Sequence, residues 1–219
     1  MKRVIIVGAG GFGREVHGWF TDWCNAQASR QGEYRFAGFL DRNAEALTGS
    51  GLDAPIFGDP ATYQPQPDEV FVCGLGLPRP RMLCCRGLQA RGADFLTVIH
   101  PTAIIGPRSS FGVGCVLCPY VVVTCDVQVG DFAVLNLHAT VGHDARLGHG
   151  VTLSGHADVT GHVVLGEEVF LASHASVIPG VRVPDRVMVG AGSVVVRASG
   201  SDVTMFGVPA LPIPSIRPR

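Results

Sequence analysis

Histidine is concentrated in one part of this 219-residue chain, where six of its eight histidines fall between residues 138 and 174. Three of the six are spaced 18 residues apart: His138, His156 and His174. His143 precedes Gly161 by the same 18 residues. A neutral imidazole can act as a general base, and the bare backbone N–H of a glycine can stabilise a developing oxyanion. If the fold stacks residues that are 18 apart, His143 and Gly161 therefore form a candidate catalytic pair.

Asp144 adds a carboxylate to this pair. It follows His143 directly and precedes His162 by 18 residues. A carboxylate beside an imidazole can orient the ring and stabilise its charged form. For a single surface histidine, simple exposure to solvent is the usual explanation, and it stays open for each histidine taken alone.

A six-residue hydrophobic period explains why residues 18 apart should meet. From Ile99 to Val195 an aliphatic or aromatic residue occupies every sixth position, 17 times without exception. The residue four positions after each of these apolar residues is small. The residue directly after each apolar residue is often glycine. Helices repeat at about 3.6 residues and strands at 2, so neither alone gives this pattern.

A short strand followed by a corner gives a period of six, and three such units close a triangular coil of 18 residues. The large residue points inward, the small one fits beside it, and we expect glycine to permit the tight turn. Residues 99–195 are therefore predicted to form a parallel β-helix of about five coils, with neighbouring coils about 4.8 Å apart. A β-sandwich would need irregularly spaced turn signals instead.

Composition argues against several classes of protein. Hydrophobic residues make up 47% of the chain and charged residues 16%, with a net charge of −1. No basic excess indicates a nucleic acid or an anionic membrane as partner. No apolar run approaches the length of about 20 residues that crosses a bilayer, and Met1 leads directly into a strand pattern without a signal peptide. We expect a cytoplasmic protein.

The seven cysteines fit reduced thiols in that compartment. Cys115 and Cys118 form a C-x2-C pair, but no second pair follows at the spacing of a zinc ribbon. Cys115 also falls in the small, inward column. We therefore interpret both cysteines as packing residues and expect no metal.

The N-terminal segment has the pattern of a nucleotide-binding unit. A buried strand at 2–7 is followed by the glycine-rich sequence Gly8 to Gly13, a helix at 14–29 and a strand at 34–40 that ends at Asp41. Glycines at the start of a helix let backbone N–H groups approach a phosphate. A tight turn without a ligand is the alternative.

The remaining N-terminal segments predict a third strand at 69–73, a helix at 80–91 and a short strand at 95–99 that leads into the prism. A parallel sheet of about four strands is half of a dinucleotide-binding fold and suits a nucleotide-sugar better than NAD. We predict three units: a Rossmann-like domain at 1–98, the β-helix at 99–195, and a tail at 196–219 that caps the open end.

Taken together, these motifs resemble one known family, the NeuD/PglD-type sugar acetyltransferases, which are hexapeptide-repeat enzymes that use acetyl-CoA. The resemblance covers nearly the whole chain. It rests on Val4 to Gly13, Phe39-Leu40-Asp41, Ile99-His100-Pro101, Leu135-Asn136, Val141-Gly142-His143-Asp144, Val189 to Val195 and Gly207-Val208-Pro209-Ala210.

The resemblance implies an α/β Rossmann-like domain followed by a left-handed β-helix, a homotrimer with active sites between neighbouring chains, and acetyl transfer to a nucleotide-linked amino sugar in surface-glycan biosynthesis. The family's catalytic base falls on His143, its neighbouring acid on Asp144 and its oxyanion-stabilising amide on Gly161. Transfer is expected to be direct, without an acyl-enzyme.

The family's ligand contacts carry over in the same way. Coenzyme A contacts, largely through backbone, fall on Thr152, Ser173 and Ala191. Nucleotide-sugar contacts fall on Gly10, Gly11, Phe12, Asp41, Arg42 and Gly76. The chain departs from some members, which have histidine at the positions of Phe12 and Thr152, and from others, which have an acid at the position of Arg42.

Three alternative functions stay open at this point. O-acetylation of a sugar hydroxyl, as in sialic acid, would use the same scaffold. A zinc hydratase of the γ-carbonic anhydrase type would use His138 and His143, but it would also need a histidine at position 102, which is threonine. A scaffold without catalytic activity is the third alternative.

Overall fold

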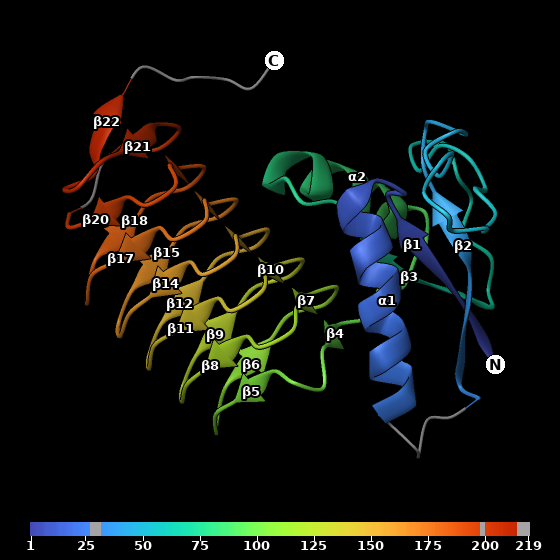
Figure 1. The fold of residues 1–219 in the computed structure, drawn as a ribbon, viewed down its shortest axis with the longest axis horizontal. Coiled ribbons are helices and arrows are strands. Elements are labelled where there is room, and N and C mark those ends of the chain that lie inside the picture. Colours follow the sequence, from blue (N-terminus) through green and yellow to red (C-terminus); the bar gives the residue numbers. More distant parts are fainter. Residues whose placement is uncertain (27–31, 198–199, 214–219) are drawn as a thin grey trace.

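A computed structural model describes residues 1–26, 32–197 and 200–213. The chain forms an N-terminal α/β domain beside a long parallel β-helix, whose coils advance from the α/β domain toward the C-terminus (Figure 1). This is the predicted fold class: a Rossmann-like α/β domain followed by a left-handed β-helix.

The N-terminal domain is built on a three-stranded parallel sheet in the order β2–β1–β3. Its strands are β1 (Lys2–Val7), β2 (Tyr34–Leu40) and β3 (Glu69–Cys73), at the predicted bounds. Its helices are α1 (Gly11–Ala26) and α2 (Pro78–Ala90). α1 begins three residues before the predicted start, and the predicted end of that helix lies outside the described residues.

The prediction that residues 95–99 form a fourth strand of this sheet is wrong. Phe95 forms a single bridge to Phe71, and only Val98–Ile99 is a strand, β4. β4 pairs with β7 of the β-helix and not with β3. The connection therefore passes to the β-helix three residues after Phe95, and the sheet has three strands.

The β-helix has three faces, which we number in the order in which the chain visits them. Face 1 contains β4, β7 (Val116–Leu117), β10 (Val134–Leu135), β13 (Thr152–Leu153), β16 (Phe170–Leu171), β19 (Met188–Val189), β21 (Thr204–Phe206) and β22 (Leu211–Ile213). Face 2 contains β5 (Ile104–Ile105), β8 (Val122–Val123), β11 (Thr140–Val141), β14 (Asp158–Val159), β17 (Ser176–Val177) and β20 (Val194–Val195). Face 3 contains β6 (Ser110–Phe111), β9 (Gln128–Val129), β12 (Arg146–Leu147), β15 (Val164–Leu165) and β18 (Arg182–Val183).

Three corners join these faces in each coil. In the coil that starts at β10, corner 1–2 is residues 136–139, corner 2–3 is residues 142–145 and corner 3–1 is residues 148–151. Consecutive strands of a face pair in parallel with a register of 18 residues, for example Val141 with Val159. The predicted 18-residue coil is confirmed.

The hydrophobic column fills the inside of the prism. From Leu117 to Val195 every member of this column is at most 5% exposed. Most of the small column beside it is buried as well, and it includes Cys115, whose thiol donates a hydrogen bond to the carbonyl oxygen of Gly130. Cys118 is likewise fully buried. Both cysteines therefore pack in the interior, as predicted, and this burial raises the pKa of Cys115 to about 12.

The glycines that follow the inward-pointing residues were expected to permit the tight turns, and this explanation is wrong. Glycines such as Gly142 and Gly148 do not have positive φ; an added Cβ at either would lie 2.6 Å from backbone atoms of the next coil. They are needed because stacked backbones approach closely. Positive φ falls two residues later, at most corners on residues with side chains such as His138 (58°) and Asp144 (60°), and at four corners on glycine, for example Gly150 (67°). Most of the turn strain is therefore carried by residues that have side chains.

The tail adds an antiparallel hairpin, β21–β22, to the end of face 1. β21 continues the parallel ladder of β19, and Met205 and Ala210 are buried against the last coil. The N–H of Ala210 donates to the carbonyl oxygen of Val194. The hairpin thus covers backbone and core at this end. Among the described residues no helix is long and apolar enough to span a membrane.

Replacing Val159 by aspartate tests the register. Val159 is 0% exposed between Val141 and Val177 of the adjoining coils, so Val159→Asp buries a charge without a partner and should cost several kcal/mol. Arg146→Asp, at an exposed outward position of face 3, is the control. Circular dichroism on heating should show a folded control and an unfolded or insoluble Val159→Asp chain. A Val159→Asp chain as stable as the control would mean that the register is misassigned.

Candidate active site

Corner 2–3 brings together the three residues that the sequence predicts as catalytic. The Nδ1 atom of His143 lies 2.8 Å from Oδ2 of Asp144. Both side chains are about half exposed, at 55% and 48%. With the imidazole proton on Nδ1 and donated to the carboxylate, Nε2 carries the lone pair that a general base needs.

Gly161 lies one coil further along, in register with His143. A Cβ added at Gly161 would lie 2.7 Å from Nε2 of His143, so the imidazole occupies the space that a side chain at position 161 would take. Within the described part of the chain, the N–H of Gly161 donates to no protein acceptor. An unpaired amide beside a basic imidazole nitrogen is the pairing that acyl transfer requires.

The histidine ladder lies at another corner. The rings of His138, His156 and His174 stack along corner 1–2 with centroids 4.8 and 4.7 Å apart and nearly parallel planes. Tyr120 continues the stack below His138. The predicted ladder is thus present. Face 2 separates it from His143, so His138 and His143 do not converge on one point of this chain.

The N-terminal domain carries a pocket of about 770 Å³ at the carboxyl ends of its three strands. Its lining includes Gly8, Asp41, Arg42 and Leu75. Oδ2 of Asp41 accepts a hydrogen bond from the N–H of Ala9, at 2.9 Å, which ties the end of β2 to the glycine turn. Carboxyl ends of parallel strands are the usual ligand position in such sheets.

The glycines of the turn divide into two groups. A Cβ at Gly8 or Gly13 would meet protein atoms at 2.8 and 1.9 Å, and Gly8 has a φ of 98°. These two are required by the backbone itself. A Cβ at Gly10 would have nothing within 4 Å, and Gly11 would meet only the tip of Arg14 at 4.0 Å. Gly10 and Gly11 face open space, which suits close approach of a ligand.

The other predicted acceptor residues flank this turn. Phe12 is half-buried and packs edge-on against Trp19 on α1, and the exposed Arg42 lies at the pocket rim. The carbonyl oxygen of Gly76 is held by the hydroxyl of Thr152, at 3.1 Å. This hydrogen bond fixes the carbonyl group of Gly76 to the β-helix.

Arg81 is a residue that the sequence reasoning missed. It is 0% exposed on α2, and burial lowers the pKa of its guanidinium. The guanidinium donates six hydrogen bonds, to carbonyl oxygens of Leu75, Gly76, Phe132, Gly150 and Val151 and to the hydroxyl of Thr152. It thereby joins the loop after β3 to corner 3–1 and face 1. A charged residue on the apolar face of a predicted helix, three residues before Cys84 and seven before Leu88, was the available signal.

The predicted coenzyme A residues do not lie together. The resemblance assigns Thr152 to the coenzyme, but its side chain is 4% exposed beneath Arg81 and holds the two domains together. Ser173 and Ala191 are exposed and stack in register at corner 1–2, where the N–H of Gly192 donates to the carbonyl oxygen of Ser173. The surface that these two residues form is separate from Thr152.

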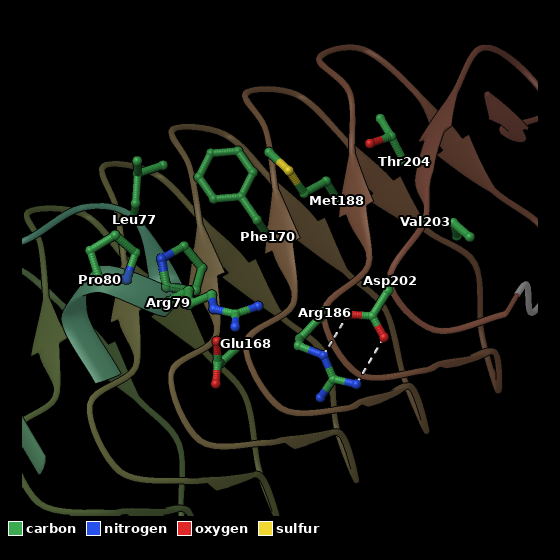
Figure 2. A pocket seen from close by; sticks show the side chains of 11 residues that line it. Leu77, Arg79, Pro80, Glu168, Phe170, Arg186, Met188, Asp202, Val203 and Thr204 are labelled. Atoms are coloured by element: carbon green, nitrogen blue, oxygen red, sulfur yellow. Dashed lines mark hydrogen bonds and ion pairs between the residues drawn. The ribbon is translucent and has the colours of Figure 1, made fainter. Parts of the chain in front are cut away.

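A second groove, of about 560 Å³, runs between the start of α2 and face 1. Figure 2 shows its side chains: Phe170 and Met188 from successive strands, with Arg79 from α2 and the paired Arg186 and Asp202 at the other side. Pro80 of α2 lines this groove and the N-terminal pocket. The two cavities are therefore neighbours on the face 1 side of the chain.

Comparison with known proteins finds one matching family profile and several similar solved structures. The family profile described as the PglD N-terminal domain matches residues 3–88. PerB from Caulobacter crescentus, solved in complex with CoA and GDP-perosamine, is 29% identical, with a TM-score of 0.84 over 98% of each chain. The acetyltransferase domain of PglB from Neisseria gonorrhoeae is 27% identical, with a TM-score of 0.84 over 97% of this chain and 100% of that one.

The chain contains a PglD N-terminal domain and is similar over nearly its whole length to sugar acetyltransferases of the NeuD/PglD type. A third structure, WeeI from Acinetobacter baumannii, is 22% identical, with a TM-score of 0.65 over 97% of this chain and all of that one, and shares the fold. No curated protein sequence matches the chain. The family resemblance that the sequence suggested is confirmed.

Removing the Arg81 guanidinium should destabilise the whole chain. Arg81→Met keeps the length of the side chain but leaves buried carbonyl oxygens without donors, and each unsatisfied acceptor costs about 1–3 kcal/mol. Arg86→Met, at an exposed position of the same helix, is the matched control and should change stability little. Urea unfolding followed by circular dichroism measures both. Equal stabilities of the two variants would contradict a structural role for Arg81.

Proposed function

We propose that the protein is an acetyl-CoA-dependent N-acetyltransferase that acts on a nucleotide-linked amino sugar in surface-glycan biosynthesis. The observation that carries the proposal is the position of His143, with Asp144 on one ring nitrogen and Gly161 beside the other. Support comes from PerB, whose solved complexes contain CoA and GDP-perosamine, and from the PglB domain in complex with acetyl-CoA.

The proposed base is Nε2 of His143. As the neutral amine of the sugar attacks the thioester carbonyl carbon, Nε2 accepts the amine proton and the ring becomes an imidazolium. The Nδ1–H donates to Asp144 throughout, and the carboxylate stabilises that positive charge. The carbon–nitrogen bond forms directly, so no acyl-enzyme is needed.

The N–H of Gly161 is the proposed donor to the carbonyl oxygen as it becomes an oxyanion. Because this amide has no acceptor within the described chain, it needs no rearrangement before the reaction. When the tetrahedral intermediate collapses, the carbon–sulfur bond breaks and the thiolate of coenzyme A leaves. The imidazolium then returns a proton to the sulfur, which restores neutral His143.

We propose that the pocket of the N-terminal domain holds the nucleotide of the acceptor. Gly10 and Gly11 offer exposed backbone at the start of α1, where N–H groups favour phosphate. Arg42 lies at the rim as a cation for the same group, and Asp41 fixes the turn. Phe12 and Gly76 are proposed at the sugar side of the site.

The coenzyme is proposed to contact Ser173 and Ala191 at corner 1–2. Both are exposed, and their small side chains leave the backbone of the stacked corners accessible. The ladder residues His156 and His174 border this surface and are proposed to act in packing or coenzyme binding only.

One chain does not contain a complete site. His143 projects from corner 2–3, whereas the N-terminal pocket and its neighbouring groove lie along face 1 and α2. In a triangular prism, face 1 is the side opposite corner 2–3. We therefore propose a homotrimer in which corner 2–3 of one chain approaches the face 1 side of the next. Closed rings of this kind require one repeated heterologous contact.

Release of free thiol from acetyl-CoA tests the activity. The acceptor panel should contain nucleotide-linked amino sugars, among them GDP-perosamine, and free sialic acid as a hydroxyl acceptor. N-acetylation predicts turnover with one or more amino sugars and none with sialic acid. Turnover with sialic acid alone would establish the O-acetyl alternative in its place.

Loss of His143 should slow the chemical step selectively. His143→Ala is expected to lower kcat by about 10²–10⁴-fold, the usual contribution of a positioned base, with little change in acetyl-CoA affinity. His156→Ala, at an exposed ladder position, is the control and should lower kcat far less. Steady-state kinetics and calorimetry with acetyl-CoA provide the two readouts. An active His143→Ala enzyme with an inactive His156→Ala control would place the base at corner 1–2.

Substitution of Gly10 should affect the acceptor only. Because a Cβ at Gly10 meets no protein atom, Gly10→Val should leave the fold intact and place its methyl groups where the phosphate approaches. The KM for the nucleotide-sugar should rise by at least tenfold, while acetyl-CoA binding stays unchanged. Gly18→Val, at another exposed α1 glycine with open space, controls for effects on the helix. Equal losses for both substrates would show that the two sites are not divided between domains.

A further inference from the structure

A second imidazole lies on the carboxylate that orients His143. Nδ1 of His162 is 3.8 Å from Oδ2 of Asp144, while Nδ1 of His143 is 2.8 Å from the same oxygen. The two rings meet edge to face with centroids 4.9 Å apart. One ligand atom from each of the three residues lies within 4.8 Å of the other two.

These distances approach those of a transition-metal site. Ligand atoms about 2.1 Å from a tetrahedral zinc ion lie roughly 3.4 Å from one another, so the two measured contacts bracket the required value. Two imidazole nitrogens and one carboxylate are a common donor set for zinc, with a position left for water. All three side chains are exposed, so an ion can enter from solvent.

The stacked coils hold the three residues in place before any ion binds. Asp144 and His162 occupy the same position of successive coils, with φ of 60° and 59°. The N–H of His162 donates to the carbonyl oxygen of His143 at 2.8 Å, and that of Asp144 donates to Cys125 at 3.2 Å. The ligand backbones are therefore fixed by the same register that forms the core.

Asp144 is the carboxylate of this column that is available for an ion. One coil below, both oxygens of Asp126 are bound by the guanidinium of Arg108, at 2.6 and 2.7 Å. This ion pair, with its hydrogen bonds, lowers the pKa of Asp126. One coil above His162 the equivalent position is Gly180, which has no side chain. The metal-binding residues therefore come from two neighbouring coils only.

We propose that His143, Asp144 and His162 form a binding site for a divalent transition-metal ion such as Zn²⁺, and that this ion and acetyl transfer exclude each other. The metal site is inferred from the geometry alone. Its exclusion of acetyl transfer also depends on the proposed role of His143 as the base. A metal ion on Nδ1 of His143 takes the lone pair of that nitrogen. The single proton of the neutral ring is then on Nε2, which can no longer accept a proton from the amine.

Calorimetry with ZnCl₂ tests the site in the full-length, chelator-treated protein. The wild type should bind one ion per chain. His162→Asn should weaken binding by about tenfold or more, because it removes one ligand, and asparagine tolerates the positive φ at this position. His156→Asn is the matched control, since His156 is an exposed histidine with a φ of 60° on another corner, and it should bind as the wild type does. Both variants retain all seven cysteines.

No zinc binding by the wild type, or equal binding by the wild type and His162→Asn, would overturn the site. Thiol-release assays then test the exclusion. Zinc should inhibit the wild type, a chelator should restore activity, and His162→Asn should stay active at the same zinc concentration. Full activity of the zinc-loaded wild type would overturn the exclusion and leave the site standing. Because binding is measured without substrates, its result does not depend on the proposed acetyl transfer.

Discussion

Parallel stacking of 18-residue coils is the constraint on which the rest of the structure depends. Backbone hydrogen bonds between coils fix each residue above the one 18 positions earlier, as in the pairing of Val141 with Val159. The same spacing that closes the apolar core brings His143 against Gly161 and Asp144 against His162. The contacts between corner residues are thus a consequence of the register in the core. A shift of one residue would disrupt both the core and these contacts.

This register makes much of the fold readable from the sequence. An apolar residue at every sixth position predicts the strands of the β-helix, and the pairs at 18-residue spacing predict which corner residues meet. The prediction of a base, an acid and a glycine at one corner follows from three positions alone. The strands of the N-terminal sheet also begin and end where their apolar runs do.

The features that the sequence could not predict depend on contacts that do not follow the six-residue repeat. Arg81 binds carbonyl oxygens on both sides of the domain boundary, and nothing local to its helix identifies those acceptors. Thr152 was assigned by resemblance to the coenzyme, yet α2 covers it. The glycine columns were read as turn residues, although the strained dihedral angles fall on neighbours such as His138. Each of these three features depends on packing between segments that are distant in the sequence.

The separation of His143 from the two cavities has the largest consequence for the proposed function. His143 lies at corner 2–3, and the pocket that contains Asp41 lies with α2 on the side of face 1. The Arg81 hydrogen bonds hold α2 to corner 3–1 and face 1, so this separation is built into each chain. If His143 is the base and this pocket holds the acceptor, as we propose, one chain cannot bring them together while the domain contact is intact, and a second copy is needed.

Mixed oligomers test this central claim most directly. Chains carrying His143→Ala and chains carrying Gly10→Val can be co-expressed with different affinity tags, and assemblies that contain both can be purified. If each site takes its base from one chain and its nucleotide pocket from the next, every mixed trimer contains one intact site and should show about a third of the wild-type activity. At nucleotide-sugar concentrations well below KM, each variant alone should be nearly inactive. Mixed assemblies as inactive as the separate variants would show that each site lies within one chain, contrary to this account.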